Sequence, residues 1–546
     1  MSRRHWTRSY GSIPLEIDAD RHPSLNAILE QAMRQFAAKP AFHAFGTTLT
    51  YADVDRMSCA FAAFLQNIAG VKAGDRVAVM LPNLLAFPIV AIAVWKIGAV
   101  LVNVNPLYTT RELEHQLNDA GVESIVVCNA SAAATLAAVI GNTGVETVVT
   151  VDQNDCGGIG PALTDIDRAA LRDAVSLSAA IARGEALRCD PADATGNDLL
   201  LLQYTGGTTG VSKGAALSHR NLIANIEQFK AFMTGALEPG AEVVVTAIPL
   251  YHIFALAVNF LTYFSIGAEN WLVANPRNVD ALFEVLGAAR PTVLTGVNTL
   301  YATLASHPRM VTTDWSRLKL SAGGGAAVMR VVSERWEAAT GQFIREGYGL
   351  SETSPVISFN PQFTAEFTGT TGLPVPSTDV KLLDDADHEA GIGECGEVCV
   401  KGPQVTAGYW NAPEANAKAF TSDGYFRTGD IGVFNEHGFL KIVDRKKDMI
   451  IVSGFNVYPN EIEAVAAAFA GVAECACIGV PDPKTGEAVE LFVVRRAAMD
   501  VSETELIAHC RSALAPYKIP KAVRFVDALP KSTVGKILRR ELHRMG

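Results

Sequence analysis

The sequence predicts an α/β protein with a large amino-terminal domain, residues 1–445, and a small α+β carboxy-terminal domain, residues 446–546. Apolar strands alternate with helices up to residue 150, and the alternation resumes after residue 214 until about residue 345. Continuous apolar strands between helices are typical of parallel sheets, so these stretches predict two α/β subdomains. From residue 369 to residue 440, short strands and Gly/Pro turns indicate a small β-subdomain.

Capping signatures mark two helix starts in the first subdomain. Thr50 with Asp53 and Thr109 with Glu112 are pairs that cap helix amino termini. The expected helices are 51–66, one from residue 84 onward, and 110–119, and the expected strands are 76–81, 100–104, 124–128 and 147–151. Residues 152–198 are weakly periodic and are interpreted as a surface connection.

Bulk composition narrows the class of protein. A chain of 546 residues is too long for one hydrophobic core, and its 49% hydrophobic and 19% charged residues indicate a folded protein. The net charge of −11 argues against a general nucleic-acid binder. Nine cysteines without a C-x-x-C pair are typical of reduced thiols in a cytoplasmic protein.

No membrane span is predicted. The longest apolar stretch, residues 84–104, contains Pro88, Lys96 and Gly98, so it is interpreted as a buried helix followed by a strand. The basic amino terminus is not followed by an apolar segment, so a signal peptide is not expected.

A loop rich in Gly and Thr follows an apolar strand at residues 199–202. Glycines allow close backbone approach, and the Thr hydroxyls and a Lys ammonium can hold phosphate. It differs from the common nucleotide loop because Ser212 precedes the lysine, and a flexible turn is the alternative interpretation. The candidate phosphate-binding residues are Thr205, Gly206, Gly207, Thr208, Thr209, Gly210 and Lys213.

Two further glycine-rich segments are candidates for nucleotide contacts. In the segment 346–353, Tyr348 could stack on a purine and Glu352 could hold Mg²⁺ beside phosphates, or Ser351 could simply cap a helix. Three glycines at 323–325 follow a predicted strand and would let a flat ring lie on the backbone, although any tight turn would also use them.

Charged residues near the carboxy terminus complete the set of candidates. Asp430 follows a tight turn and could accept both hydrogens of a ribose diol, or it could be an ordinary turn residue. The charge run 444–448 is either a solvated hairpin or a hinge. Lys536 follows Gly535 and could reach an anionic centre on its long side chain.

In order and spacing, these segments resemble the adenylate-forming superfamily of acyl-CoA synthetases, nonribosomal peptide adenylation domains and firefly luciferase. The resemblance covers nearly the whole chain. It is strongest to the bacterial long-chain fatty-acid–CoA ligases, on the segments 104–108, 249–254, 444–448, 452–463 and 536–540.

The resemblance implies a role for each candidate residue. The loop 205–213 would bind the β- and γ-phosphates of ATP, Glu352 would bind Mg²⁺, and Lys536 would contact the reacting carboxylate and the α-phosphate. One departure from some relatives is Gly206, which stands where they have Thr or Ser, so a second Mg²⁺ ligand is not assigned. The other implied positions are Gly323, Gly324, Gly325, Glu346, Gly347, Tyr348 and Gly349 around adenine, Asp430 with Arg445 at the ribose, His252 beside the acyl site, Lys447 at the hinge, and Gly454 with Phe455 toward CoA.

The implied reaction has two steps. A fatty acid and ATP give acyl-AMP and pyrophosphate, and CoA then gives acyl-CoA and AMP, with rotation of a mobile carboxy-terminal domain between the steps. The alternatives are a ligase for medium-chain or aryl acids, an enzyme that loads a carrier protein, and a nucleotide sensor without turnover. Acyl chain length and oligomeric state stay open.

The end of the chain is strongly basic. This could be a solvated face, a surface that meets nucleotide phosphates, or a weak peripheral attraction to an anionic membrane leaflet. Residues 515–546 hold Lys518, Lys521, Arg524, Lys531, Lys536, Arg539, Arg540 and Arg544 against Asp527 and Glu541.

Overall fold

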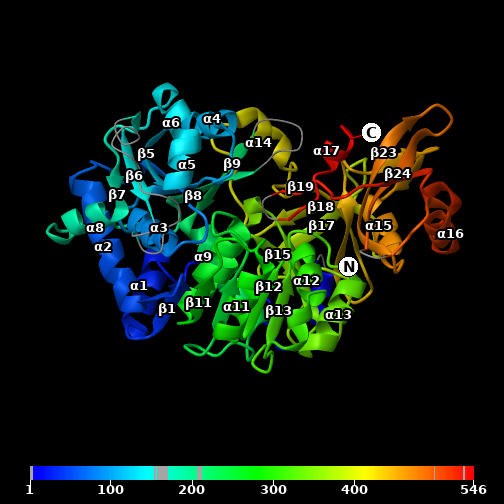
Figure 1. Cartoon of the computed structure of the whole chain (residues 1–546), viewed down its shortest axis with the longest axis horizontal. Helices are drawn as coiled ribbons and strands as arrows, with labels where there is room; N and C mark the ends of the chain where they lie inside the picture. The colour runs from blue at the N-terminus through cyan, green and yellow to red at the C-terminus, as the bar shows by residue number, and fades with distance from the viewer. Residues whose placement is uncertain are drawn as a thin grey trace.

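The computed structural model describes residues 4–152, 155, 170–205, 212–496, 499–532 and 535–545. Within these residues the strands form a seven-stranded, a nine-stranded, a four-stranded and a five-stranded sheet. The first two belong to the large amino-terminal part, and the last lies in the carboxy-terminal part at the right of Figure 1. The predicted α/β fold with a small carboxy-terminal domain is therefore confirmed.

The seven-stranded sheet has the order β7-β6-β5-β3-β4-β8-β9 and is parallel except for β9, which runs antiparallel to β8. All four strands predicted here are present within about two residues. The strands are β3 (Arg76–Met80), β4 (Val100–Asn103), β5 (Val122–Cys128), β6 (Thr147–Val151), β7 (Val175–Ser176), β8 (Leu199–Thr205) and β9 (Lys213–Ser218).

The nine-stranded sheet has the order β16-β15-β14-β13-β12-β10-β11-β1-β2, with a parallel centre from β14 to β1 and antiparallel edges. Its strands are β1 (Pro40–Ala44), β2 (Thr47–Thr50), β10 (Val243–Thr246), β11 (Glu269–Leu272), β12 (Val293–Gly296), β13 (Leu320–Gly323), β14 (Ile344–Gly349), β15 (Val356–Phe359) and β16 (Leu373–Pro374).

Helices pack around and between these sheets (Figure 1). Both predicted capping boxes are formed, at α2 and α4, and every residue of α3 is buried in a core shared with both sheets. The helices include α1 (Leu25–Gln35), α2 (Tyr51–Asn67), α3 (Ala86–Lys96), α4 (Thr110–Ala120), α8 (Leu177–Glu185), α9 (His219–Phe232), the π-helix η4 (Ala255–Thr262), α11 (Val279–Ala289), α12 (Asn298–Ala305) and α13 (Arg330–Thr340).

The prediction of a plain surface connection over residues 152–198 is wrong for the described part of that stretch. Strand β7 joins the edge of the seven-stranded sheet, and α8 packs on α2. A Cβ atom at Gly184 would lie 1.8 Å from the Ala60 carbonyl oxygen, so this glycine is what lets the two helices touch. Weak periodicity hid a short helix that tertiary packing stabilises.

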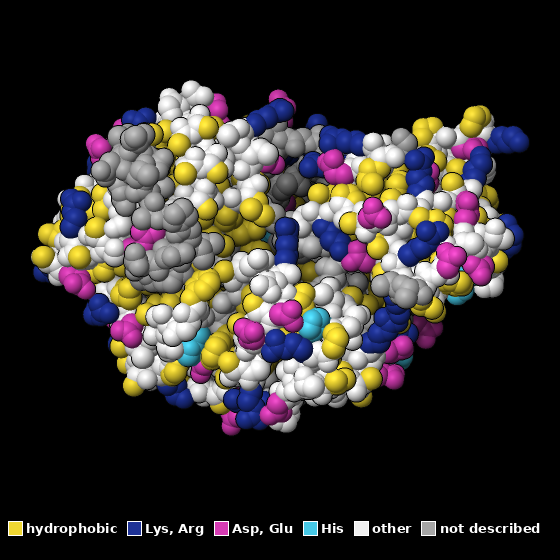
Figure 2. Space-filling model, in the orientation of Figure 1, with side chains coloured by type: hydrophobic (Ala, Val, Ile, Leu, Met, Phe, Trp, Pro, Cys, Tyr) yellow, Lys and Arg dark blue, Asp and Glu magenta, His cyan; other side chains and the backbone are white. Residues whose placement is uncertain are grey.

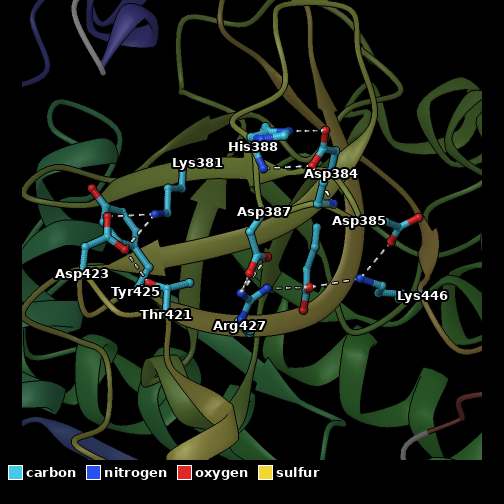
Figure 3. Close-up of polar contacts among 12 residues, drawn as sticks. Lys381, Asp384, Asp385, Asp387, His388, Thr421, Asp423, Tyr425, Arg427 and Lys446 are labelled. Atoms are coloured by element: carbon cyan, nitrogen blue, oxygen red, sulfur yellow. Dashed lines mark hydrogen bonds and ion pairs between the residues drawn. The ribbon is translucent and has the colours of Figure 1, made fainter.

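The predicted β-subdomain is an antiparallel sheet in the order β17-β18-β19-β20. One face carries ion pairs between Lys381 and Asp423, between Arg427 and Asp387, and between Lys446 and Asp385 (Figure 3). Its strands are β17 (Asp379–Leu383), β18 (Gly396–Lys401), β19 (Phe426–Phe434) and β20 (Leu440–Arg445), and α14 (Pro413–Ala419) precedes β19.

The carboxy-terminal part has its own sheet and its own hydrophobic core. In the sheet order β22-β21-β24-β23, β25 also pairs with β24. The elements are β21 (Ile450–Val452), β22 (Phe455–Val457), α15 (Pro459–Ala467), β23 (Val472–Asp482), β24 (Gly486–Arg495), α16 (Glu503–Ala513), β25 (Ala522–Phe525) and α17 (Arg539–Leu542). In the described part of the chain, no helix has the length and apolar character needed to cross a membrane.

Candidate active site

The ends of the predicted phosphate loop lie next to each other. Thr205 ends β8 and Lys213 begins β9, and these two residues are register partners in the antiparallel pair. Gly206, Gly207, Thr208, Thr209 and Gly210 lie outside the described residues. The Lys213 ammonium group lies 5.4 Å from the centre of the Tyr409 ring, within the range of a cation–π contact.

Tyr409 also contacts the predicted magnesium ligand. Its hydroxyl donates a hydrogen bond of 2.7 Å to Oε1 of Glu352, which lies in the short 3₁₀ helix η6 (Ser351–Thr353) after β14. Glu352 is buried, and burial raises the pKa of its carboxyl. Tyr409 therefore joins Lys213 to Glu352. It was not among the predicted residues because nothing in its local sequence marks it.

The predicted ribose residues Asp430 and Arg445 form an ion pair, and Tyr348, which was predicted near adenine, is hydrogen-bonded to Asp430. The Tyr348 hydroxyl donates to Oδ2 of Asp430 over 2.7 Å, and Nε of Arg445 lies 3.3 Å from Oδ1 of the same carboxylate. Asp430 and Arg445 are register partners on β19 and β20, so the sheet itself places them together. The Asp430 side chain is only 5% exposed, whereas that of Arg445 is 42% exposed and reaches solvent.

The glycines after β13 provide close contacts for two other side chains. A Cβ atom at Gly324 would lie 3.2 Å from a ring carbon of Phe254, and one at Gly325 would lie 3.3 Å from Cε of Lys536. Gly325 has a φ of +78°, which favours glycine in any case. Gly323 is needed for packing, because its Cβ would lie 2.6 Å from Val328.

Lys536 is thus brought from the carboxy-terminal part onto the nine-stranded sheet. The preceding residue, Gly535, accepts a hydrogen bond of 3.4 Å from the Thr299 hydroxyl through its carbonyl oxygen. Burial of the ammonium group, assisted by the charge of Arg445, lowers the pKa of Lys536 to about 8. In Figure 2 the surface is hollowed between the amino-terminal sheets and the carboxy-terminal part, with Lys and Arg side chains along its edge.

His252 lies within the electrostatic reach of Lys536. Burial, with the charge of Lys536 as the second cause, lowers the pKa of His252 to about 3, so its ring is neutral at pH 7. Its Nδ1 accepts a hydrogen bond of 3.3 Å from the Phe254 backbone N–H, so the ring proton is on Nε2. A neutral ring can donate one hydrogen bond here but cannot supply a positive charge.

Burial and packing account for several of the residues that were predicted around adenine. Burial raises the pKa of Glu346 to about 8, so this side chain is mostly uncharged at pH 7. Packing alone explains Gly347 and Gly349, because Cβ atoms there would lie 2.6 Å from Phe359 and 1.8 Å from the Pro355 carbonyl oxygen. The alternative interpretation of a tight structural turn therefore suffices for these two glycines.

No hydrogen bond or ion pair to this group is found for three other predicted residues, which lie in the described part of the chain. Lys447 is exposed in the turn between β20 and β21. Phe455 begins β22, stacks on Tyr517 at 4.7 Å between ring centres, and is 55% exposed, so its ring faces solvent. Gly454 before it has a φ of +81°, so the turn itself favours glycine.

The described side chains could bind a magnesium ion only if phosphate oxygens of a nucleotide supplied further ligands. Among the described residues no group of three or more His, Cys, Asp or Glu side chains could hold a metal ion. Mg²⁺ commonly uses one or two carboxylates together with substrate phosphates and water. Glu352 could serve as such a carboxylate: Tyr409 donates a hydrogen bond to its Oε1 and also contacts Lys213 at the end of the phosphate loop.

Comparison with known proteins identifies the class. The AMP-binding enzyme family matches residues 29–410, and the AMP-binding enzyme C-terminal domain matches residues 461–536. The chain belongs to the AMP-binding enzyme family. The predicted superfamily is therefore confirmed.

Individual relatives are similar in sequence or structure over more than nine-tenths of the chain. The chain is 47% identical to the long-chain-fatty-acid–CoA ligase of Salmonella typhimurium, covering 99% of this chain and 98% of that one. It is 35% identical to the feruloyl-CoA synthase of an Amycolatopsis species, covering 91% and 94%. Among solved structures, ATP-bound MatB from Rhodopseudomonas palustris matches with a TM-score of 0.84 at 31% identity, covering 96% and 99%.

Proposed function

We propose that the protein is an ATP-dependent long-chain fatty-acid–CoA ligase. In the first step a carboxylate oxygen of the fatty acid attacks the α-phosphorus of ATP, and the bond to the leaving pyrophosphate breaks. In the second step the thiolate of CoA attacks the acyl carbonyl, and AMP leaves. The overall likeness to fatty-acid–CoA ligases at 47% identity supports this choice.

The observation that carries the proposal is the contact of Lys536 with Gly325, close to the group formed by Tyr348, Asp430 and Arg445. A mononucleotide whose ribose is held by Asp430 would direct its α-phosphate toward this ammonium group. Charge grows on the phosphate oxygens as the acyl oxygen attacks, and a fixed cation stabilises that charge. The chain needs no covalent nucleophile, since positioning and charge stabilisation perform the work.

The remaining roles follow from the same arrangement. Lys213 and the residues of the loop 205–213 would hold the β- and γ-phosphates, and Glu352 would hold Mg²⁺, which supplies charge neutralisation to the leaving pyrophosphate. Tyr348 and the glycines 323–325 would line the adenine position. His252 would donate a hydrogen bond from Nε2 beside the acyl carboxylate, which agrees with its neutral state.

We place the domain boundary at residues 445 and 446. Arg445 is the last residue of β20, which pairs with β19 in the β-subdomain. The next strand, β21, begins at Ile450 and belongs to the separate carboxy-terminal sheet. Lys447, in the exposed turn between these strands, would be the hinge. Rotation about it would withdraw Lys536 and bring Gly454 and the exposed Phe455 toward incoming CoA.

An aryl acid is the second candidate substrate, because a feruloyl-CoA synthase is 35% identical. The test is AMP formation by the purified protein with a series of saturated fatty acids and with ferulic acid, with and without CoA. The proposal expects AMP formation that needs both a long-chain acid and CoA. Preference for ferulic acid would favour the aryl ligase, and pyrophosphate release without CoA consumption would favour the carrier-loading enzyme.

Ion pairing at the basic carboxy terminus argues for at most weak attraction to a membrane. Of the eight Lys and Arg side chains in residues 515–546, all except Lys536 form ion pairs in the structure. Paired charges contribute little long-range attraction to an anionic leaflet. Among the interpretations of this basic segment, a solvated face with internal ion pairs is therefore favoured over a membrane-binding surface.

Replacing Asp430 by alanine should weaken ATP use by roughly ten- to hundredfold, because hydrogen bonds from a ribose diol to a carboxylate contribute about 1.5–3 kcal/mol. The measurement is kcat/KM for ATP in fatty-acid-dependent pyrophosphate formation. Asp423→Ala is the matched control, since Asp423 is an exposed carboxylate in the turn before β19 that pairs with Lys381 on β17 (Figure 3). Unchanged ATP kinetics in a folded Asp430→Ala protein would refute the ribose assignment.

The pH dependence of the first step should report Lys536. Because the pKa of Lys536 is lowered to about 8, the ammonium form is present below pH 8 and is lost as the pH rises above it. The kcat/KM for ATP in pyrophosphate formation, which reports groups of the free enzyme, should fall through about pH 8. A Lys536→Arg protein keeps its charge over this range, so its profile should lack this fall. The same fall in both proteins would assign it to another group.

A further inference from the structure

A buried ion-pair network lies next to the loop that carries Lys536, here called the lysine loop. The network centres on Arg539, the first residue of α17 and three residues after Lys536. Nη2 of Arg539 lies 2.8 and 2.9 Å from the two carboxylate oxygens of Glu463 and 3.0 Å from Oδ1 of Asn460. Both partners lie on α15. The guanidinium group therefore fixes the start of α17, and with it the lysine loop, onto α15.

Asp444 joins this network from the other side of the hinge turn. It lies near the end of β20 and is only 1% exposed. Its Oδ2 accepts a hydrogen bond of 2.8 Å from the Asn460 backbone N–H, and its Oδ1 accepts one of 2.8 Å from the Arg445 backbone N–H. The Asn460 side chain also donates to the Val443 carbonyl oxygen over 3.0 Å. The strand β20 is thus bonded directly to the first turn of α15.

The positive and negative side chains of this network compensate one another's charge. Nη1 of Arg539 lies 4.0 Å from Asp444 and 3.6 Å from Asp448, so one guanidinium group faces these two carboxylates and that of Glu463. Burial raises the pKa of Asp444 to about 6 in spite of this cation. Removal of one partner from a buried set of this kind leaves the others uncompensated, which is costly.

The residue just before Lys447 is held by the amino-terminal part. The Lys446 backbone N–H donates to the Gly429 carbonyl oxygen over 2.9 Å. Its ammonium group lies 3.2 Å from Asp385 and 3.4 Å from Glu397, both in the β-subdomain, and Figure 3 shows this pairing with Asp385. A rotation at Lys447 would leave Lys446 and Asp444 in place and would carry Asn460 and Arg539 away from them.

We infer that Asp444 is a positioning residue for the first half-reaction: through Asn460 and Arg539 it holds the carboxy-terminal domain in the orientation that brings Lys536 to the ATP site. This inference rests on the proposed function. In the rotated orientation the bonds from Asp444 to Asn460 and its attraction to Arg539 are absent. Asp444 therefore stabilises only one of the two orientations, and such differential contacts are what shifts a two-state equilibrium.

The test is Asp444→Asn, in which an amide replaces the carboxylate at nearly the same size. One oxygen acceptor becomes an N–H donor that faces a backbone N–H, and the attraction to Arg539 is lost. The rate of fatty-acid-dependent pyrophosphate formation should fall by about tenfold or more. CoA attack on supplied acyl-AMP should be unchanged or faster, because the rotated orientation becomes more populated. Asn460→Ala should shift the ratio of the two half-reactions in the same direction by less.

Glu490→Gln is the matched control. Glu490 is also a buried carboxylate that pairs with an arginine, Arg524, but both residues lie within the carboxy-terminal sheet. A loss of packing or folding in that domain should slow both half-reactions together in this control. The inference is wrong if Asp444→Asn and Asn460→Ala leave the ratio of half-reactions at the wild-type value, or change both rates by the same factor. A wild-type protein without fatty-acid-dependent AMP formation would instead overturn the proposed function.

Discussion

Replacing Lys536 by alanine should slow fatty-acid-dependent pyrophosphate formation by roughly 100- to 1,000-fold, the loss that follows removal of one fixed group that stabilises a developing oxyanion. The Lys536 side chain lies with its Cε against Gly325, and Tyr348, Asp430 and Arg445 form the neighbouring group. In the second half-reaction the acyl-adenylate already exists, so the lysine is needed much less. CoA attack on supplied acyl-AMP should therefore stay within a fewfold of the wild-type rate.

Each half-reaction can be measured alone, pyrophosphate release without CoA and acyl-CoA formation from synthetic acyl-AMP. Lys531→Ala is the control, because Lys531 lies five residues earlier on the same segment and pairs with Glu474 within the carboxy-terminal part. That protein should keep both rates. Equal losses of both half-reactions in Lys536→Ala would show that the lysine supports the fold rather than the chemistry.

Local sequence signals predicted the elements, and they marked several candidate residues that the structure brings together. The capping boxes at Thr50 and Thr109 depend on side chains three residues apart, and an apolar run is enough to indicate a buried parallel strand. Asp430 and Arg445 could be proposed from the resemblance, and the antiparallel pairing of β19 with β20 places them side by side. Short-range chemistry and motif spacing carry this much information.

Contacts between distant segments could not be predicted in this way. Tyr409 reaches Glu352 from 57 positions away, and Arg539 reaches Glu463 from 76 positions away. Both contacts depend on how sheets and domains pack, which no local pattern encodes. For the glycines, a local pattern was present but allowed two explanations. Gly347 and Gly349 belong to a nucleotide motif, yet close packing against Phe359 and Pro355 already requires glycine there.

The orientation of the carboxy-terminal domain bears on the hinge. With Lys536 against Gly325, the structure has the orientation that the proposed adenylation step requires. The turn at the proposed hinge is closed by a hydrogen bond of 3.0 Å from the Asp448 N–H to the Arg445 carbonyl oxygen. Lys446 is tied to the β-subdomain and Asp448 lies 3.6 Å from Arg539. Lys447 lies between these two anchored residues, so its φ and ψ are where a rotation of the domain can be absorbed.

Replacing Lys447 by proline should therefore abolish most acyl-CoA production, by roughly 100-fold or more, while pyrophosphate formation stays within about tenfold of wild type. Proline fixes φ near −65° and so removes the freedom that rotation requires. It also restricts the residue before it, which is why a modest loss in the first step is expected. The measurement is the pair of half-reactions, with acyl-AMP accumulation in the presence of CoA as a direct sign of the arrested enzyme.

Lys447→Ala separates the pivot from the charge. This protein loses the ammonium group but keeps a flexible backbone, so both half-reactions should proceed near wild-type rates. If the folded Lys447→Pro protein also runs both half-reactions at wild-type rates, the pivot lies elsewhere in the turn. If Lys447→Ala loses acyl-CoA formation as severely as Lys447→Pro, the lysine acts through its charge. The hinge assignment requires the proline protein alone to be arrested after adenylation, since only proline restricts the backbone on which rotation depends.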